Sequence, residues 1–141
     1  MCIRDSSLAT RPGRACYVPL LHEGDLEHPV GQQIETKAAL EIMAPLLTDP
    51  GVLKIFQNAK FDLLILERVG RGILDGPIAP IDDTMLISYA QGAGLHGHGM
   101  DELAARNLGH TPITYDQVTG TGRNRIPVSY THLTLPTICS V

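Results

Sequence analysis

Apolar residues recur at helical and strand-like spacings along the middle of the chain, and this alternation predicts the fold class. Positions three or four residues apart indicate four helices: about Glu35 to Leu47, a segment around Phe61 to Val69, a helix opened by Asp82 or Asp83, and Met100 to Leu108. Short apolar runs at Val52–Phe56 and Ile78–Ile81 indicate strands. Because strands that alternate with helices favour crossover connections, we predict an α/β layer fold with at least two parallel neighbours.

The same periodicity predicts which side chains each helix turns toward the core. The expected inner faces are Ala39, Ile42, Met43, Leu46 and Leu47 in the first helix, Phe61, Leu64, Ile65 and Val69 in the second, Met85, Leu86, Tyr89 and Ala90 in the third, and Leu103 and Ala104 in the fourth. Asn58 is placed to cap the start of the second helix, and Asp83 is expected to be the N-cap of the third.

Two strand-like runs near the N-terminus predict a hairpin. Ser7–Thr10 and Ala15–Leu20 flank the segment Arg11-Pro12-Gly13-Arg14. Proline followed by glycine is typical of a turn between strands, because proline presets one backbone angle and glycine tolerates the left-handed region.

Both ends of the chain differ in character from its middle. From about Pro127 onward, neither a period nor turn chemistry links the sequence to what precedes it. This segment and Met1 to Ser6 resemble the translated adapter sequence that contaminates assembled environmental reads. We therefore expect a domain over residues 7–126, with 1–6 and 127–141 as non-native ends.

Composition narrows the possible functions. The 141 residues are 43% hydrophobic and 18% charged, as expected of one soluble globular domain, and no apolar run approaches the ~20 residues of a membrane-spanning helix. We expect a cytoplasmic protein without a membrane partner. The three cysteines, Cys2, Cys16 and Cys139, lack the spacing of a disulfide framework or zinc site. A net charge of −4 argues against binding nucleic acid by charge alone but suits a nuclease whose bound cations supply positive charge.

The segment Gln57-Asn58-Ala59-Lys60-Phe61-Asp62 places two amides, an ammonium and a carboxylate at a predicted strand-to-helix junction. Ligands of α/β sheets gather outside such strand ends, and a carboxylate in the first helical turn is favoured in its ionised form. Asp62 could hold a divalent cation there, while the neighbouring donors contact a phosphate or base. The alternative is that Asn58 only caps the helix, Asp62 is an ordinary first-turn acid, and Phe61 is a core residue.

A longer sequence pattern helps to decide between a functional and a purely structural role for this segment. The pattern consists of Gln57–Asp62, then Ala79-Pro80-Ile81-Asp82-Asp83-Thr84-Met85-Leu86-Ile87-Ser88-Tyr89, then His98–Ala104, Leu108–Ile113 and Val118–Asn124. In this order and with these intervals, the stretch from about Leu8 to Asn124 resembles the proofreading 3′-5′ exonuclease domain of bacterial DNA polymerase I, of the DEDD exonuclease superfamily. A match of this length is far more specific than any one motif.

The resemblance implies an RNase H-like mixed sheet with flanking helices. It implies hydrolysis of the 3′-terminal phosphodiester of DNA by water and two divalent ions, Mg²⁺ or Mn²⁺/Zn²⁺. Asp62 would be a catalytic residue and metal ligand, and a polymerase domain would lie in cis. The single-stranded 3′ end would be contacted by Gln57, Asn58, Lys60, Phe61 and Tyr115.

Three of the family's four acids have no counterpart in this sequence. An Asp-x-Glu pair would precede Ser7, and a Tyr-x-x-x-Asp motif would follow Asn124. We therefore expect a truncated domain, without its first strand and last helix, that is inactive as an isolated chain because one carboxylate does not hold two Mg²⁺ ions.

Two other functions remain open. One is a non-catalytic module that binds single-stranded DNA through Gln57, Asn58, Lys60 and Tyr115. The other is an RNase D-type ribonuclease, against which the segments Asp83–Leu86 and Gly109–Pro112 argue. His96 and His98 have no third ligand nearby in the sequence, so His98 is expected to order the loop before the fourth helix rather than to bind a metal.

Overall fold

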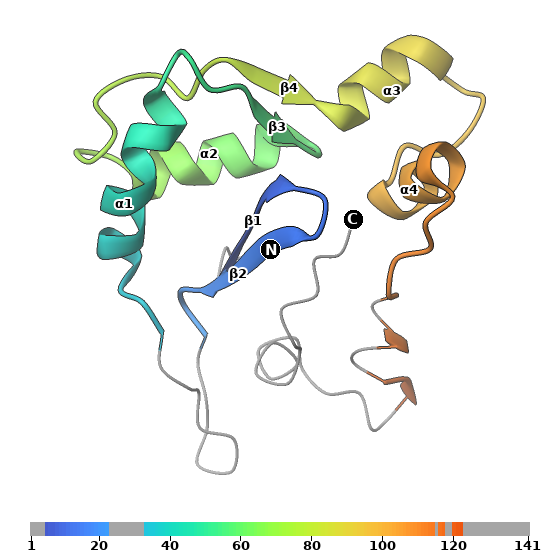
Figure 1. The fold of residues 1–141 in the computed structure, drawn as a ribbon, viewed down its shortest axis with the longest axis horizontal. Helices are drawn as coiled ribbons and strands as arrows, with labels where there is room; N and C mark the ends of the chain where they lie inside the picture. The colour runs from blue at the N-terminus through green and yellow to red at the C-terminus, as the bar shows by residue number, and fades with distance from the viewer. Residues whose placement is uncertain (1–4, 23–32, 115, 118–119, 123–141) are drawn as a thin grey trace. The chain divides into compact units, whose positions relative to one another are not determined.

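The structure is a computed structural model that describes residues 5–22, 33–114, 116–117 and 120–122. The chain divides into two compact units, one made of Met1–Thr36 with Ile113–Val141 and the other of Lys37–Pro112. Figure 1 shows the helices and strands within each unit. Among the helices of the described ranges, none has the length and apolar character needed to cross a bilayer.

The first unit contains the predicted hairpin. β1 (Asp5–Arg11) pairs antiparallel with β2 (Arg14–Pro19), with a register shift between Ala9 and Arg11. Gly13 adopts φ 71°, the left-handed conformation that glycine adopts without steric penalty, so the turn chemistry acts as predicted. The ladder reaches Asp5, which lies opposite Pro19. The boundaries at residues 7 and 126 stay a prediction.

The second unit contains most of the predicted elements. They are α1 (Thr36–Thr48), whose first residue is counted with the first unit, β3 (Lys54–Phe56), α2 (Ala59–Val69), β4 (Ile81–Asp83), α3 (Thr84–Gly92) and α4 (Met100–Leu108). β3 and β4 pair in parallel, with Lys54 opposite Ile81 and Phe56 opposite Asp83. The α/β class and the parallel neighbours are therefore confirmed. The strand predicted over Ile78–Ile81 instead begins at Ile81 and runs directly into α3 (Figure 1).

Lys54 fixes the approach to this small sheet. Its side chain is buried, and its ammonium group donates hydrogen bonds to the carbonyl oxygens of Asp49, after α1, and of Ala79, before β4. A buried ammonium is stable only when its hydrogens find acceptors. The Lys54 ammonium therefore links the loop that enters β3 to the loop that enters β4.

The predicted helix faces are right in part. In α1, Ala39, Met43 and Leu47 are buried as expected, together with Leu40. Ile42 and Leu46, predicted to point inward, are exposed. The predicted inner faces of α2 and α3 are mostly wrong. Ile65 and Met85 are half-buried, but the other large side chains predicted to be buried are exposed: Phe61, Leu64, Val69, Leu86 and Tyr89. In α4, Leu103 and Ala104 are half-buried.

Candidate functional site

The candidate site begins where β3 ends. Gln57 and Asn58 connect Phe56, the last residue of β3, to Ala59, the first residue of α2. Asn58 adopts φ 61° and ψ 50°, a left-handed conformation that asparagine tolerates better than most side chains. It occupies the N-cap position, but its side chain makes no capping hydrogen bond, so the predicted capping role is wrong.

Asp83 caps the helix instead. Its Oδ1 accepts a hydrogen bond from the backbone N–H of Asn58 at 3.0 Å, and its Oδ2 accepts from the N–H of Ala59 at 2.8 Å. The same carboxylate caps α3, as predicted, by accepting from the N–H groups of Met85 at 2.9 Å and Leu86 at 3.3 Å. One buried side chain thus satisfies backbone donors at the starts of two helices.

These hydrogen bonds decide the charge of Asp83. Burial by itself raises the pKa of a carboxyl group, but the four backbone N–H donors outweigh it and hold the pKa of Asp83 below its usual value. Asp83 is therefore a carboxylate whose oxygens are already used inside the protein. It occupies the anion position at the start of α2, where a phosphate would otherwise be favoured.

Asp62 lies in the first turn of α2 and is only partly exposed. Burial, and then the negative charge of Asp83, raise the pKa of Asp62 above its ordinary value. A carboxylate in such a place is costly to ionise, and a nearby cation would relieve that cost. In the described ranges, no group of three or more His, Cys, Asp or Glu side chains could hold a metal ion. This junction can therefore supply one carboxylate ligand to a metal ion. That ligand is Asp62, because the oxygens of Asp83 already accept backbone hydrogen bonds.

The other predicted site residues of this segment differ in how they are held. Lys60 and Phe61 are exposed beside Asp62, so Phe61 is not a core residue. The side-chain amide of Gln57 is held within the chain: its Nε2 donates to the carbonyl oxygen of His98 at 2.9 Å, and its Oε1 accepts from the hydroxyl of Thr84. Tyr115 lies outside the described residues.

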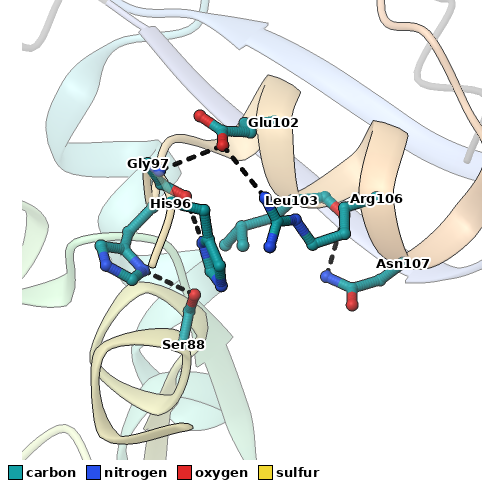
Figure 2. A network of polar contacts seen from close by, with 8 residues as sticks. Ser88, His96, Gly97, Glu102, Leu103, Arg106 and Asn107 are labelled. Atoms are coloured by element: carbon teal, nitrogen blue, oxygen red, sulfur yellow. Dashed lines mark hydrogen bonds and ion pairs between the residues drawn. The ribbon is translucent and has the colours of Figure 1, made fainter. Parts of the chain in front are cut away.

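His98 orders the loop before α4, as predicted. Its ring is buried, its Nδ1 is 2.7 Å from the Oγ of Ser88 on α3, and its ring centroid lies 3.7 Å from that of Tyr89. Figure 2 shows the polar contacts around Ser88 and the start of α4. The role of Ser88 was missed, because a single serine within a helix carries no distinguishing sequence signal.

Glu102, on α4, also holds the loop that precedes this helix. Its Oε1 accepts a hydrogen bond from the backbone N–H of Gly97 at 3.0 Å and lies 3.5 Å from the guanidinium of Arg106, one turn further along α4 (Figure 2). A Cβ atom at residue 97 would overlap Glu102 Oε2, so the carboxylate can keep this position only beside a glycine. The loop from His96 to Gly99 therefore connects the end of β3, α3 and α4.

Known proteins match this chain over most of its length. A family model described as 3′-5′ exonuclease matches residues 6–132. DNA polymerase I of Rhizobium leguminosarum is 43% identical over 118 residues, which cover 80% of this chain and 11% of that protein. DNA polymerase I of Pseudomonas aeruginosa is 37% identical over 85% of this chain and 13% of its own length. DNA polymerase I of Chloroflexus aurantiacus is 30% identical over 85% of this chain and 12% of its own length.

The matches confirm the resemblance drawn from the sequence, and the chain spans 11–13% of the length of these three relatives. The matched range contains the whole β3–α2–β4–α3 junction, including Asp62 and Asp83. Because the family model covers well over half of the residues, the chain belongs to the 3′-5′ exonuclease family.

Proposed function

We propose that this chain is part of an RNase H-like domain that removes 3′-terminal nucleotides from DNA. The observation that carries the proposal is the position of Asp62, a partly exposed carboxylate in the first turn of α2, directly after β3 and inside the matched segment. The relatives are named DNA polymerase I, which favours DNA over RNA as the substrate and a polymerase domain as the partner in cis. The names of these relatives therefore disfavour the ribonuclease alternative.

In this proposal Asp62 donates one carboxylate to a centre of divalent ions, and the remaining acids come from parts of the domain outside Ser7–Asn124. The ions would supply an activated water and stabilise the charge that develops on the leaving oxygen. The exposed side chains of Lys60 and Phe61 suit the DNA strand, because an ammonium attracts phosphate and an aromatic ring stacks on a base. Gln57 and Asn58 would add hydrogen bonds, and Tyr115 a second stacking surface.

An exonuclease assay on a longer polypeptide, in which this segment is joined to the rest of its domain, tests the role of Asp62. With Mg²⁺ and end-labelled single-stranded DNA, Asp62→Ala is expected to reduce hydrolysis to background and to leave DNA affinity within about twofold, because one ligand is lost and the strand contacts remain. Asp82→Ala, two positions into β4 and exposed, is the matched control and should keep full activity. Full hydrolysis by Asp62→Ala would contradict the assignment.

The chain alone is expected to behave differently. Mg²⁺ keeps its water unless several oxygen ligands replace it, and the described residues contain no group of three or more His, Cys, Asp or Glu side chains that could hold a metal ion. We therefore expect no digestion of labelled DNA above a control without protein. Digestion that EDTA abolishes would show that the chain contains a complete metal centre.

A second candidate is a module that only binds single-stranded DNA. It is favoured by two observations together: the described ranges contain no cluster of side chains that could hold a metal ion, and Lys60 and Phe61 are exposed beside Asp62. The two functions differ in their need for the ion. If the longer polypeptide binds DNA equally with Mg²⁺ and with EDTA but hydrolyses none, the binding module is the better description.

A further inference from the structure

The carboxamide of Gln57 is fixed in orientation by its neighbours. The carbonyl oxygen of His98 can only accept a hydrogen bond, so the nitrogen of the carboxamide must face it, at 2.9 Å. The oxygen of the carboxamide then faces the hydroxyl of Thr84, whose one hydrogen it shares with the carbonyl oxygen of Phe56. Each end keeps capacity for one more partner, because an NH₂ group has two hydrogens and an amide oxygen two lone pairs.

The carbonyl of His98 is itself held in place by a buried contact. Ser88 and His98 are both 7% exposed, and the hydroxyl oxygen of Ser88 lies 2.7 Å from Nδ1 of His98. Tyr89 packs against the imidazole, and His96 lies next to it with ring centroids 4.8 Å apart. A buried polar pair with one favourable geometry restricts the backbone that carries it. The hydroxyl of Ser88 therefore fixes the loop, and the loop fixes Gln57.

We propose that Ser88 and His98 are positioning residues that pre-orient the Gln57 carboxamide for a single-stranded DNA 3′ end, although neither touches the DNA. The inference rests on the proposed function for its ligand. The free hydrogen of Gln57 Nε2 donates to an oxygen of the DNA strand, and the buried Ser88–His98 pair removes the rotamer freedom that binding would otherwise have to restrict. Gln57 is thereby both a structural link and a contact residue.

Fluorescence anisotropy with a 3′-labelled oligothymidine and the 141-residue chain measures the DNA contact. Gln57→Ala is expected to weaken affinity about fivefold, the equivalent of one hydrogen bond. Ser88→Ala should weaken it by roughly two- to threefold as the carboxamide loses its fixed orientation. In the Gln57→Ala background, Ser88→Ala should have no further effect on affinity, because two changes that act through one contact are not additive. Equal effects in both backgrounds would overturn the proposal and leave Ser88 a purely structural residue.

Solvent exchange of the Gln57 side-chain NH₂ in ¹⁵N-labelled protein tests the positioning without DNA. Its signals are identified by their disappearance in Gln57→Ala. Ser88→Ala should accelerate their exchange at least severalfold. Asn107→Ala is the matched control, since it removes a hydrogen bond to the carbonyl of Leu103 on α4 and touches neither Gln57 nor His98, so it should change nothing.

The two measurements separate the inference from the proposed function. If the unaltered chain binds no DNA, the proposed function fails, and the exchange rates still decide whether Ser88 orients Gln57. If Ser88→Ala leaves the exchange unchanged, the positioning role is wrong whatever the DNA affinity. Should Ser88→Ala not fold, Ser88→Cys replaces it, because a thiol is a weaker hydrogen-bond partner for His98 in the same position.

Discussion

α1 and α2 have similar amphipathic sequences but are anchored by different forces. α1 buries four apolar side chains, among them Leu40 at 2% exposure. α2 fully buries only Ala59, and three of its large apolar residues are exposed: Phe61, Val69 and Leu64, the last at 58%. What holds the start of α2 is polar: the carboxylate of Asp83 on two of its N-terminal N–H groups and the side chain of Gln57 just before it.

This difference separates the part of the unit that provides stability from the part that carries the candidate site. Apolar burial stabilises in proportion to area and tolerates small shifts in geometry, whereas a hydrogen-bonded junction fixes positions to within tenths of an ångström. A site that must place Asp62 and Gln57 needs the second kind of anchor. Substitutions in α1 should therefore change stability most, and substitutions at the junction should change both stability and geometry.

The largest effect is expected at Leu40. Leu40→Ala removes a fully buried side chain and should lower the free energy of unfolding by about 3 kcal/mol, from lost transfer energy and the cavity left behind. Leu64→Ala makes the same chemical change on α2 and should lower it by less than about 0.5 kcal/mol, because the side chain is mostly solvated. Urea unfolding followed by circular dichroism gives both values. Equal losses would show that the face of α2 is covered in solution.

The second-largest loss in the free energy of unfolding is expected at Asp83. Asp83→Ala leaves four backbone N–H groups without their acceptor and uncaps two helices, for an expected loss of about 2 kcal/mol, or ~1 per cap. Asp82→Ala, at the neighbouring exposed position, should change the free energy of unfolding by less than about 0.5 kcal/mol. The same urea titrations compare the two variants. A loss in Asp82→Ala as large as in Asp83→Ala would place the effect in β4 and not in the caps.

How far the sequence predicted these features follows from the kind of interaction. Helical periods, the Pro-Gly turn and the N-cap at Asp83 are local, so the elements and their order could be predicted. The long-range hydrogen bonds could not: Asp83 reaches across 25 residues to Asn58, and Gln57 across 41 residues to His98. Periodicity also shows that Phe61 and Leu64 share a face but not whether another element covers it. The position of Asp62 in the first turn of the second helix was predicted correctly, and its nearness to Asp83 was not predicted.

A smaller loss is expected at Gly97. Gly97→Ala places a Cβ atom where Glu102 Oε2 now lies, so the glutamate must rotate away and its hydrogen bond to the N–H of residue 97 is lost, at about 0.5–1 kcal/mol. Gly76→Ala is the matched control, because a Cβ there meets nothing within 4 Å. It should be neutral or slightly stabilising, since alanine restricts the unfolded chain. Thermal melts resolve the difference, and an unchanged melting temperature for Gly97→Ala would show that Glu102 contributes nothing to the loop.

The smallest effect concerns Asp62, and it is expected to change with pH. A carboxyl group whose pKa is raised by folding above the ordinary 3.8 stabilises the protein below that value, and the contribution is lost as the pH rises through the raised pKa. Asp83 has the opposite sign, because its lowered pKa stabilises the protein at neutral pH and this contribution is lost in acid. Asp62→Asn removes the ionisation that folding opposes.

Asp62→Asn should therefore equal or slightly exceed the unaltered chain in stability at pH 7 and lose that advantage by pH 3. Urea titrations at pH 3, 5 and 7 measure the difference, with Asp82→Asn as the exposed control that should show none. A variant less stable than the parent at pH 7 would mean that the charge of Asp62 already has a stabilising partner in the fold. If Asp62→Asn is more stable than the unaltered chain at pH 7, the charge of Asp62 destabilises the fold. Such a cost is expected of a carboxylate whose role is to bind a cation.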